Sequence, residues 1–158
     1  MIQKLINIWS ENMDIKRIKI DGFKNLKDID LTLNNITSLL SINSYGKTNT
    51  LTAIIFGIDF IIRNNETRKN QMMYNPAIPV NKNYLSKTFS FEIEATVNNE
   101  EIIYGYSFLW SKNSENGKII KEYLKVKEPS ESQKFTFYIK RENESSFFKP
   151  SKTGACNK

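Results

Sequence analysis

Hydrophobic and polar residues alternate along the first half of the chain in a way that predicts three strands and one helix. Residues 36–40 form an apolar run that is typical of a central strand buried on both faces. Residues 48–63 carry apolar side chains at helical spacing, and this stripe is expected to pack on the sheet. The apolar positions of the two earlier strands are Ile15, Ile18, Ile20, Ile29, Leu31 and Leu33, and those of the helix are Leu51, Ile54, Ile55, Ile58, Ile61 and Ile62.

Strand-like alternation returns after an irregular stretch. Residues 64–88 are rich in asparagine and contain two prolines, which predicts a long mobile loop. From residue 89, alternating apolar positions and turns at Asn98-Asn99 and Asn116-Gly117 predict an antiparallel β-meander over residues 89–140. Its aromatic residues could form a base-stacking platform, but their period of two favours a hydrophobic sheet face. These residues are Tyr104, Tyr106, Phe108 and Trp110.

Residues 41–49 read Ser-Ile-Asn-Ser-Tyr-Gly-Lys-Thr-Asn and connect the apolar run to the helix. A strand, a loop that ends in Gly-Lys-Thr and a helix are the layout of a phosphate-binding loop. In such a loop, backbone N–H groups surround the phosphate oxygens, and the helix N-terminus adds a partial positive charge. Lys47 is expected to reach the β- and γ-phosphates, and the hydroxyl of Thr48 to bind Mg²⁺.

Three positions of this loop depart from the usual pattern. Ser41 stands where the pattern has glycine, which lets the loop begin with a turn that side chains resist. Ser44 occupies a position that is often glycine, and Tyr45 is bulky for its place. Weaker or altered nucleotide binding is expected from these departures. The alternative is a plain strand-to-helix turn that happens to contain Gly-Lys-Thr.

The neighbouring residues strengthen the phosphate-loop interpretation. Five short motifs occur in order: Phe23-Lys24-Asn25-Leu26-Lys27, Ile29-Asp30-Leu31, Asn43, Gly46-Lys47-Thr48-Asn49 and Leu51-Thr52-Ala53-Ile54. With these motifs the sequence resembles the opening of ABC-type ATPase heads of the SMC, RecF and OLD kind, and most closely AAA-family ATP-binding proteins of OLD-like systems. The motif-bearing resemblance covers residues 14–63, and a weaker one, in strand rhythm only, extends to residue 148.

The resemblance implies a fold, cofactors and partners. The implied fold class is α/β: a partial P-loop NTPase lobe of the ABC type, with a mixed sheet, a P-loop helix and an antiparallel β-meander. The implied cofactors are ATP and Mg²⁺. In a full-length form, a second ATPase head is expected to sandwich the nucleotides in a homodimer.

The resemblance also implies which residues form the site. Lys24 is expected near the α-phosphate, although a solvated lysine at a strand end is an equal alternative for it. Asn49 is expected to support the loop, Lys47 to hold the phosphates and Thr48 to bind the metal. The remaining loop residues are expected to supply the cofactor-binding backbone: Ser41, Asn43, Ser44, Tyr45 and Gly46.

Hydrolysis needs groups that the sequence lacks. ATPase heads of this kind hold Mg²⁺ and polarise water with an Asp-Glu pair after an apolar strand. They also contact the γ-phosphate of the partner subunit through a Leu-Ser-x-Gly-type signature. Neither motif occurs in the 158 residues, so no catalytic residue is predicted and little or no hydrolysis is expected. We expect an extension at residues 1–13, one lobe at 14–150 and a truncated tail at 151–158, as in a fragment of a longer ATPase.

Composition and charge narrow the function classes. The chain has no histidine and one cysteine, which excludes histidine-based catalysis and an intrachain disulfide and favours a cytoplasmic location. No apolar stretch is long enough to span a membrane. The net charge of +6 suits phosphate-bearing partners, although dispersed lysines are typical of a solvated surface. The rival interpretation is a degenerate, non-catalytic basic module that binds DNA, RNA or a protein partner.

Overall fold

The computed structural model describes residues 13–40, 46–73, 88–112, 116–127, 134–143 and 145–149. These residues form two helices, α2 (Lys47–Ile62) and α3 (Asn65–Gln71), and the strands β1 (Met13–Asp21), β2 (Ile29–Thr32), β3 (Thr88–Val97), β4 (Glu100–Leu109), β5 (Ile119–Lys127), β6 (Thr136–Glu142) and β7 (Ser145–Phe148). Neither of these two helices has the length and apolar character that crossing a membrane requires.

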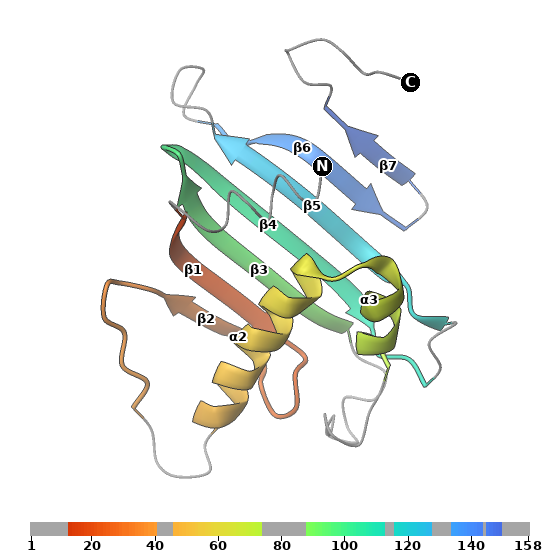
Figure 1. Ribbon diagram of the computed structural model, residues 1–158, viewed down its shortest axis with the longest axis horizontal. Helices are drawn as coiled ribbons and strands as arrows, with labels where there is room; N and C mark the ends of the chain where they lie inside the picture. The colour runs from red at the N-terminus through yellow and green to blue at the C-terminus, as the bar shows by residue number, and fades with distance from the viewer. Residues whose placement is uncertain are drawn as a thin grey trace.

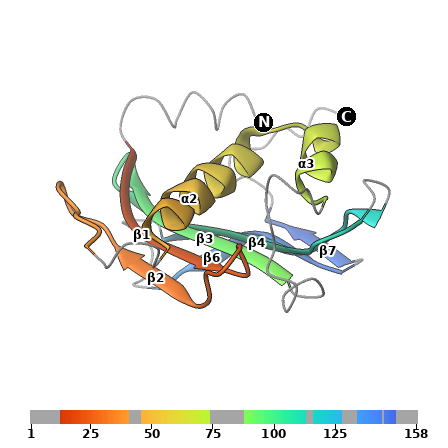
Figure 2. The same ribbon diagram turned by 90° about the horizontal axis from the view of Figure 1, so that it is seen from below.

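The strands form a single antiparallel sheet. Its order is β2-β1-β3-β4-β5-β6-β7, and each of the seven strands runs antiparallel to its neighbours. Both helices lie on the same side of this sheet (Figures 1 and 2). One face of the sheet is therefore covered by helices, and no described element lies against the other face (Figure 2).

The predicted fold class, an α/β P-loop NTPase lobe with a mixed sheet, is wrong. The described sheet contains no parallel pair. Residues 36–40 form no strand, and the side chains of Ile36 and Leu40 are 87% and 92% exposed. An apolar run forms a central strand only where neighbouring elements cover both of its faces. The backbone hydrogen bonds to β1 end at Leu33, whose N–H donates to the carbonyl of Lys16 at 2.8 Å. No described strand pairs with residues 36–40.

Helix α2 lies where the sequence predicts a helix, but only half of the predicted apolar stripe, Ile54, Ile58 and Ile61, packs against the core. Leu51 and Ile55, which belong to the predicted stripe, are 54% and 68% exposed. Phe56 and Phe60 enter the core instead. The helix is apolar almost all round, so the period of its hydrophobic residues does not select one face. Packing against an aromatic sheet selects the face with the two phenylalanines.

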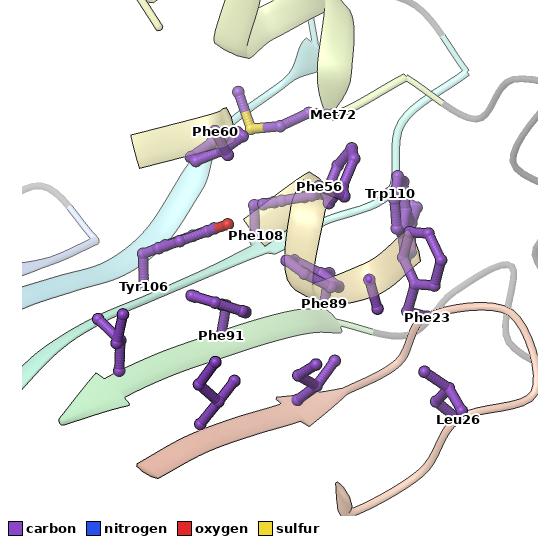
Figure 3. Close-up of a cluster of buried hydrophobic side chains, with 14 residues drawn as sticks. Phe23, Leu26, Phe56, Phe60, Met72, Phe89, Phe91, Tyr106, Phe108 and Trp110 are labelled. Atoms are coloured by element: carbon purple, nitrogen blue, oxygen red, sulfur yellow. The ribbon is translucent and has the colours of Figure 1, made fainter. Parts of the chain in front are cut away.

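The hydrophobic core is a layer of aromatic rings between α2 and the sheet (Figure 3). The rings of Phe56 and Phe89 meet edge to face at a centroid distance of 5.2 Å, and those of Phe60 and Tyr106 stack at 4.5 Å. Tyr106, Phe108 and Trp110 are 2%, 0% and 7% exposed. The hydrophobic-face interpretation of these strand aromatics is therefore confirmed, and none of these three is available as a base-stacking platform.

A glycine allows α2 to approach the sheet this closely. A Cβ atom on Gly57 would lie 2.2 Å from Cδ2 of Phe91, which is inside van der Waals contact. Without a side chain, the Gly57 carbonyl also accepts a hydrogen bond from the Tyr106 hydroxyl at 3.0 Å. Position 57 therefore fixes the helix against β3 and β4.

An irregularity in β1 explains the uneven spacing of its isoleucines. The pairing of β1 with β3 shifts between Ile15 and Arg17, which inserts one extra residue, as in a β-bulge. Because of this shift, Ile15, Ile18 and Ile20 all face the helices although the first two are three positions apart. The three-residue step from Ile15 to Ile18 in the sequence is therefore explained by the bulge.

Helix α3 lies within the stretch predicted as a loop. Its N-cap is Asn64, whose side chain accepts a hydrogen bond from the Thr67 N–H at 2.9 Å. None of its residues is buried, so no apolar period marks it in the sequence. Residues 74–87 of the predicted loop lie outside the described residues, as do the predicted terminal segments apart from Met13, the first residue of β1.

Candidate functional site

The N-terminus of α2 is the part of the predicted site that the structure describes. Helix α2 begins at Lys47, directly after Gly46, which adopts a left-handed conformation with φ 96° and ψ 5°. Glycine reaches this conformation without strain. A Cβ atom there would meet its nearest atoms at 3.4 Å, so backbone conformation and not space is the reason for glycine.

The N–H groups of the first turn of α2 have no side-chain cap. The first N–H groups of a helix have no acceptor within the helix and carry a partial positive charge. Gly46 offers no side-chain cap, and the first turn of α2 contains no acidic residue. The Thr50 hydroxyl does not cap this end either, because it donates to the Gly46 carbonyl at 3.0 Å from inside the helix.

The turn after β1 brings Lys24 and Asn25 to the first turn of α2. The Lys24 ammonium donates to Oδ1 of Asn49 at 3.3 Å, and Nδ2 of Asn49 donates to Oδ1 of Asn25 at 2.7 Å. The turn is anchored below by Phe23 and Leu26, which are 0% and 4% exposed and point into the core (Figure 3). A core contact therefore positions a cation beside the first turn of α2.

The structure brings five of the predicted site residues together and leaves four undescribed. Lys24 lies at the helix N-terminus through its bond to Asn49, and Gly46, Lys47 and Thr48 precede or begin the helix. Thr48 is exposed, and Lys47 is half-buried. Ser41, Asn43, Ser44 and Tyr45 lie outside the described residues.

Asn25 also belongs to this group, although it is not among the residues that the sequence predicts for the site. Its side chain completes the link from Lys24 through Asn49 across the two elements. The signal was present in the sequence, because Asn25 follows Lys24 directly in the turn. Nothing in the sequence pattern, however, indicates that the turn contacts the start of a helix more than twenty residues later.

A second polar cluster is buried between α3 and the sheet. Glu122 on β5 is 8% exposed and pairs with Arg68 at 3.4 Å and with Arg141 at 3.1 Å. The Tyr104 hydroxyl also donates to Glu122. Burial, together with the negative charge of Glu122, raises the pKa of Tyr104, so its phenol stays protonated and remains a donor.

This buried cluster joins the C-terminal end of α2 and helix α3 to the sheet. Arg68 donates to the carbonyls of Phe60 and Ile61 at 2.7 Å each, which satisfies the C-terminal end of α2. Every charged group of the cluster therefore has a partner within the protein. Among the residues that the structure describes, no group of three or more histidine, cysteine, aspartate or glutamate side chains could hold a metal ion.

Comparison with known proteins adds no further assignment. No protein-family model matches the chain, and no curated protein matches it.

Proposed function

We propose that the chain binds the phosphate groups of a nucleoside triphosphate, ATP, together with Mg²⁺, at the N-terminus of α2. The observation that carries the proposal is the position of Gly46, Lys47 and Thr48 at an uncapped helix start that has no acidic residue. Phosphate is favoured at such a position by N–H donors and by the helix dipole. The motif order in residues 14–63 gives independent support from the sequence.

Each described residue has a role in this proposal. The Lys47 ammonium neutralises the β- and γ-phosphates, as a lysine at the start of a helix does in phosphate-binding loops. Lys24 neutralises the α-phosphate and is oriented by Asn49. Asn49 in turn is held by Asn25. The turn after β1 therefore acts as the second side of the phosphate site.

The metal in this proposal takes few ligands from the protein. Mg²⁺ requires oxygen ligands and usually keeps several waters while binding substrate phosphates. The exposed hydroxyl of Thr48 is one suitable oxygen ligand. The described residues offer no cluster of carboxylates for the others. This donor set fits a metal that arrives with the nucleotide and not a resident ion.

We propose that hydrolysis by the chain is negligible. A phosphoryl-transfer site needs a group that positions and activates the attacking water. Asp59, an acidic residue of α2, lies three turns from the N-terminus and bonds to Arg63 at 2.9 Å and Gln71 at 2.6 Å. It therefore stabilises the end of the helix away from the proposed phosphate site.

The test is a titration of the protein with ATP in the presence and absence of Mg²⁺, followed by thermal unfolding. Ligand at a hundred times its dissociation constant should stabilise the fold by about 2.7 kcal/mol. Lys47→Ala should remove this stabilisation and leave the fold of the ligand-free protein intact. Phosphate release measured in the same samples should stay at the background level.

A matched pair of lysines tests the second side of the site. Lys24→Ala should weaken ATP binding several-fold, whereas Lys27→Ala should have no effect. Lys27 lies in the same turn, is exposed and contacts neither Asn25 nor Asn49 in the described bonds. Equal binding by wild type and Lys47→Ala, or no shift of the wild type with Mg-ATP, would contradict the proposal.

Exposed apolar residues around the site favour a protein partner there. Leu51 and Ile55 on the outer side of α2 are more than half exposed, and Ile36 and Leu40 are almost fully exposed. We propose a second copy as this partner, in a nucleotide-dependent dimer of a longer form. Light scattering of that form with and without Mg-ATP should show the dimer only with nucleotide, and a monomer under both conditions would exclude it.

A further inference from the structure

The two faces of the sheet carry aromatic residues in different surroundings. The covered face forms the aromatic core beneath α2. On the opposite face, the strand register aligns one row across the sheet: Lys19, Glu92, Gly105, Tyr123, Lys140 and Phe147. No described element lies over this row (Figure 2). Its rings and lysines therefore border solvent or a partner.

The rings on this uncovered face alternate with ammonium groups. Lys121 and Lys125 each hold their ammonium nitrogen 5.2 Å from the centroid of the Tyr123 ring. Lys125 also lies 5.1 Å from the Phe137 ring, and Lys140 lies 5.7 Å from it. We call these five residues the lysine–aromatic ladder: Lys121, Tyr123, Lys125, Phe137 and Lys140. The ladder runs along β5 and β6.

The Tyr123 ring is held flat against the sheet. Its partner on β4 is Gly105, and a Cβ atom there would lie 2.4 Å from Cζ of Tyr123, so the ring occupies the space of the missing side chain. The Tyr123 hydroxyl donates to Glu92 on β3. The hydroxyl end of the ring thus lies over the Gly105 backbone and is fixed there by Glu92.

A shallow hollow lies beside this ring. It has a volume of about 230 Å³ and is lined by Ser90, Ser107, Lys121 and Tyr123, among others. Ligand pockets usually have about 300–1,000 Å³. The hollow is therefore too small for a whole drug-sized ligand and suits one planar group that extends from a larger one.

Two lysines of the ladder form no ion pair within the described part of the chain. Lys19 on β1 pairs with Glu92 on β3 at 2.8 Å, and Lys127 at the end of β5 pairs with Glu101 on β4 at 3.0 Å. Among the described residues, no carboxylate lies within ion-pair distance of Lys121 or Lys125. Glu92 attracts Lys125 from beyond ion-pair distance, and neither lysine has a described carboxylate in direct contact, so an anionic ligand can supply that contact.

We propose that the lysine–aromatic ladder binds single-stranded nucleic acid. Its phosphates pair with Lys121 and Lys125 and draw these ammonium groups off the rings, and its bases then stack on Tyr123 and Phe137, with one base edge in the hollow beside Tyr123. Alternation of cations with aromatic rings on an open sheet is the arrangement that supplies both contacts to a strand without sequence preference. This site lies on the opposite face from the proposed nucleotide site, and neither depends on the other.

The geometry of the ladder favours a single strand over a duplex. The ring centroids of Tyr123 and Phe137 are 6.5 Å apart, and the two ring planes meet at 75°. Parallel bases at the rise of about 3.4 Å in a duplex cannot both lie flat on two rings that meet at this angle. Two neighbouring bases can occupy both rings only after they separate from each other, which paired bases do not do. A flat sheet face also presents no helix or ribbon that could enter a groove.

The test is fluorescence anisotropy with a labelled oligothymidylate of twenty nucleotides and with oligouridylate of the same length. Both should bind, because the ladder contacts only phosphates and ring faces that the two share. Phe137→Ala should weaken binding about tenfold through the loss of one stacked base. Lys121→Gln/Lys125→Gln should reduce the slope of log affinity against log salt by about 1.4, about 0.7 for each lost phosphate contact.

The matched control is Lys69→Gln/Lys112→Gln, which removes the same charge from two exposed lysines outside the ladder. It should keep the slope and nearly all of the affinity, and the melting temperature of every variant should confirm that it folds. The proposal would be overturned by a wild type that binds neither oligonucleotide, by equal losses in the two double variants, or by equal binding of a hairpin duplex that Phe137→Ala does not affect.

Discussion

The covered and uncovered faces of the sheet use the same aromatic residue types for opposite purposes. On the covered face, Phe89 contacts the rings of Phe56 and Trp110 at centroid distances of 5.2 and 5.7 Å. On the uncovered face, Phe137 has two ammonium groups over it and is 37% exposed. The comparison teaches that the helices, and not the strand sequence, decide whether a ring becomes core or surface.

The largest expected effect comes from the same substitution on the two faces. Phe89→Ala should lower the free energy of unfolding by about 3–5 kcal/mol, because it leaves a cavity among five neighbouring rings. Phe137→Ala should cost about 1 kcal/mol or less, as surface changes do. Urea denaturation of both variants measures this difference. Similar losses in the two would show that the uncovered face is also packed.

A smaller loss is expected from the arginine that joins α2, α3 and β5. Arg68→Ala removes two hydrogen bonds to the carbonyls of Phe60 and Ile61 and one partner of Glu122. Breaking a buried pair commonly costs about 3 kcal/mol or more, but Arg141 still compensates part of the Glu122 charge, so the loss should fall below that of Phe89→Ala. The control is Arg63→Ala, an exposed pair with Asp59, which should cost less than about 1 kcal/mol. Equal losses in the free energy of unfolding for Arg68→Ala and Arg63→Ala, measured by urea denaturation, would contradict the role given to Arg68.

The contact between α2 and the covered face can be tested at its closest point. Gly57→Ala places a Cβ atom against the Phe91 ring and should destabilise the protein by about 1–3 kcal/mol. Alanine is otherwise the better helix former by about 1 kcal/mol. A stabilised Gly57→Ala variant in thermal unfolding would therefore mean that α2 sits further from β3 than described.

The smallest effect concerns the carboxylate on the uncovered face. Partial burial of Glu92 opposes its ionisation, but hydrogen bonds from Lys19 and Tyr123 outweigh burial and lower its pKa. A lowered pKa in the folded state contributes stability above the ordinary glutamate value of about 4.3, and this stability is lost as the pH falls through the folded-state pKa.

In Glu92→Gln, the free energy of unfolding should therefore fall less steeply below about pH 4.3 than in the wild type. The difference between the two should be less than about 1 kcal/mol. Urea midpoints at pH 7, 4 and 3 measure this. Glu94→Gln on the same strand is the control, and it should retain the acid dependence of the wild type. An unchanged pH profile in Glu92→Gln would show that the contacts of Lys19 and Tyr123 do not favour the charged form.

How far the sequence predicts the fold depends on whether a pattern is local. The turn at Asn98-Asn99 was predictable, because both residues adopt the positive φ values of 49° and 66° that asparagine tolerates. The orientation of α2 was not, because isoleucines surround the helix and only the aromatic sheet distinguishes one side. Residues 36–40 were predicted as a central strand from hydrophobicity alone, which does not reveal whether neighbouring strands exist.

The candidate site also has a part that the local sequence predicts and a part that depends on contacts between distant segments. Gly46, Lys47 and Thr48 could be placed at a helix start from their order in the chain, since a helix boundary is a local property. The contact of Lys24 and Asn25 with Asn49 joins segments 24 and 25 residues apart, and no period in the sequence indicates it. The ladder was missed because lysines in a strand resemble any solvated strand face until the register places them beside rings.

Helix α2 is held at three points along its length, and this has a consequence for recognition. Asn25 fixes the first turn through Asn49, the Gly57 carbonyl is bound by Tyr106, and Arg68 holds the last carbonyls. The directions of the first N–H groups are therefore set when the protein folds. Any anion that docks there meets a preorganised set of donors, and the conformational entropy of this helix is spent before binding and not during it.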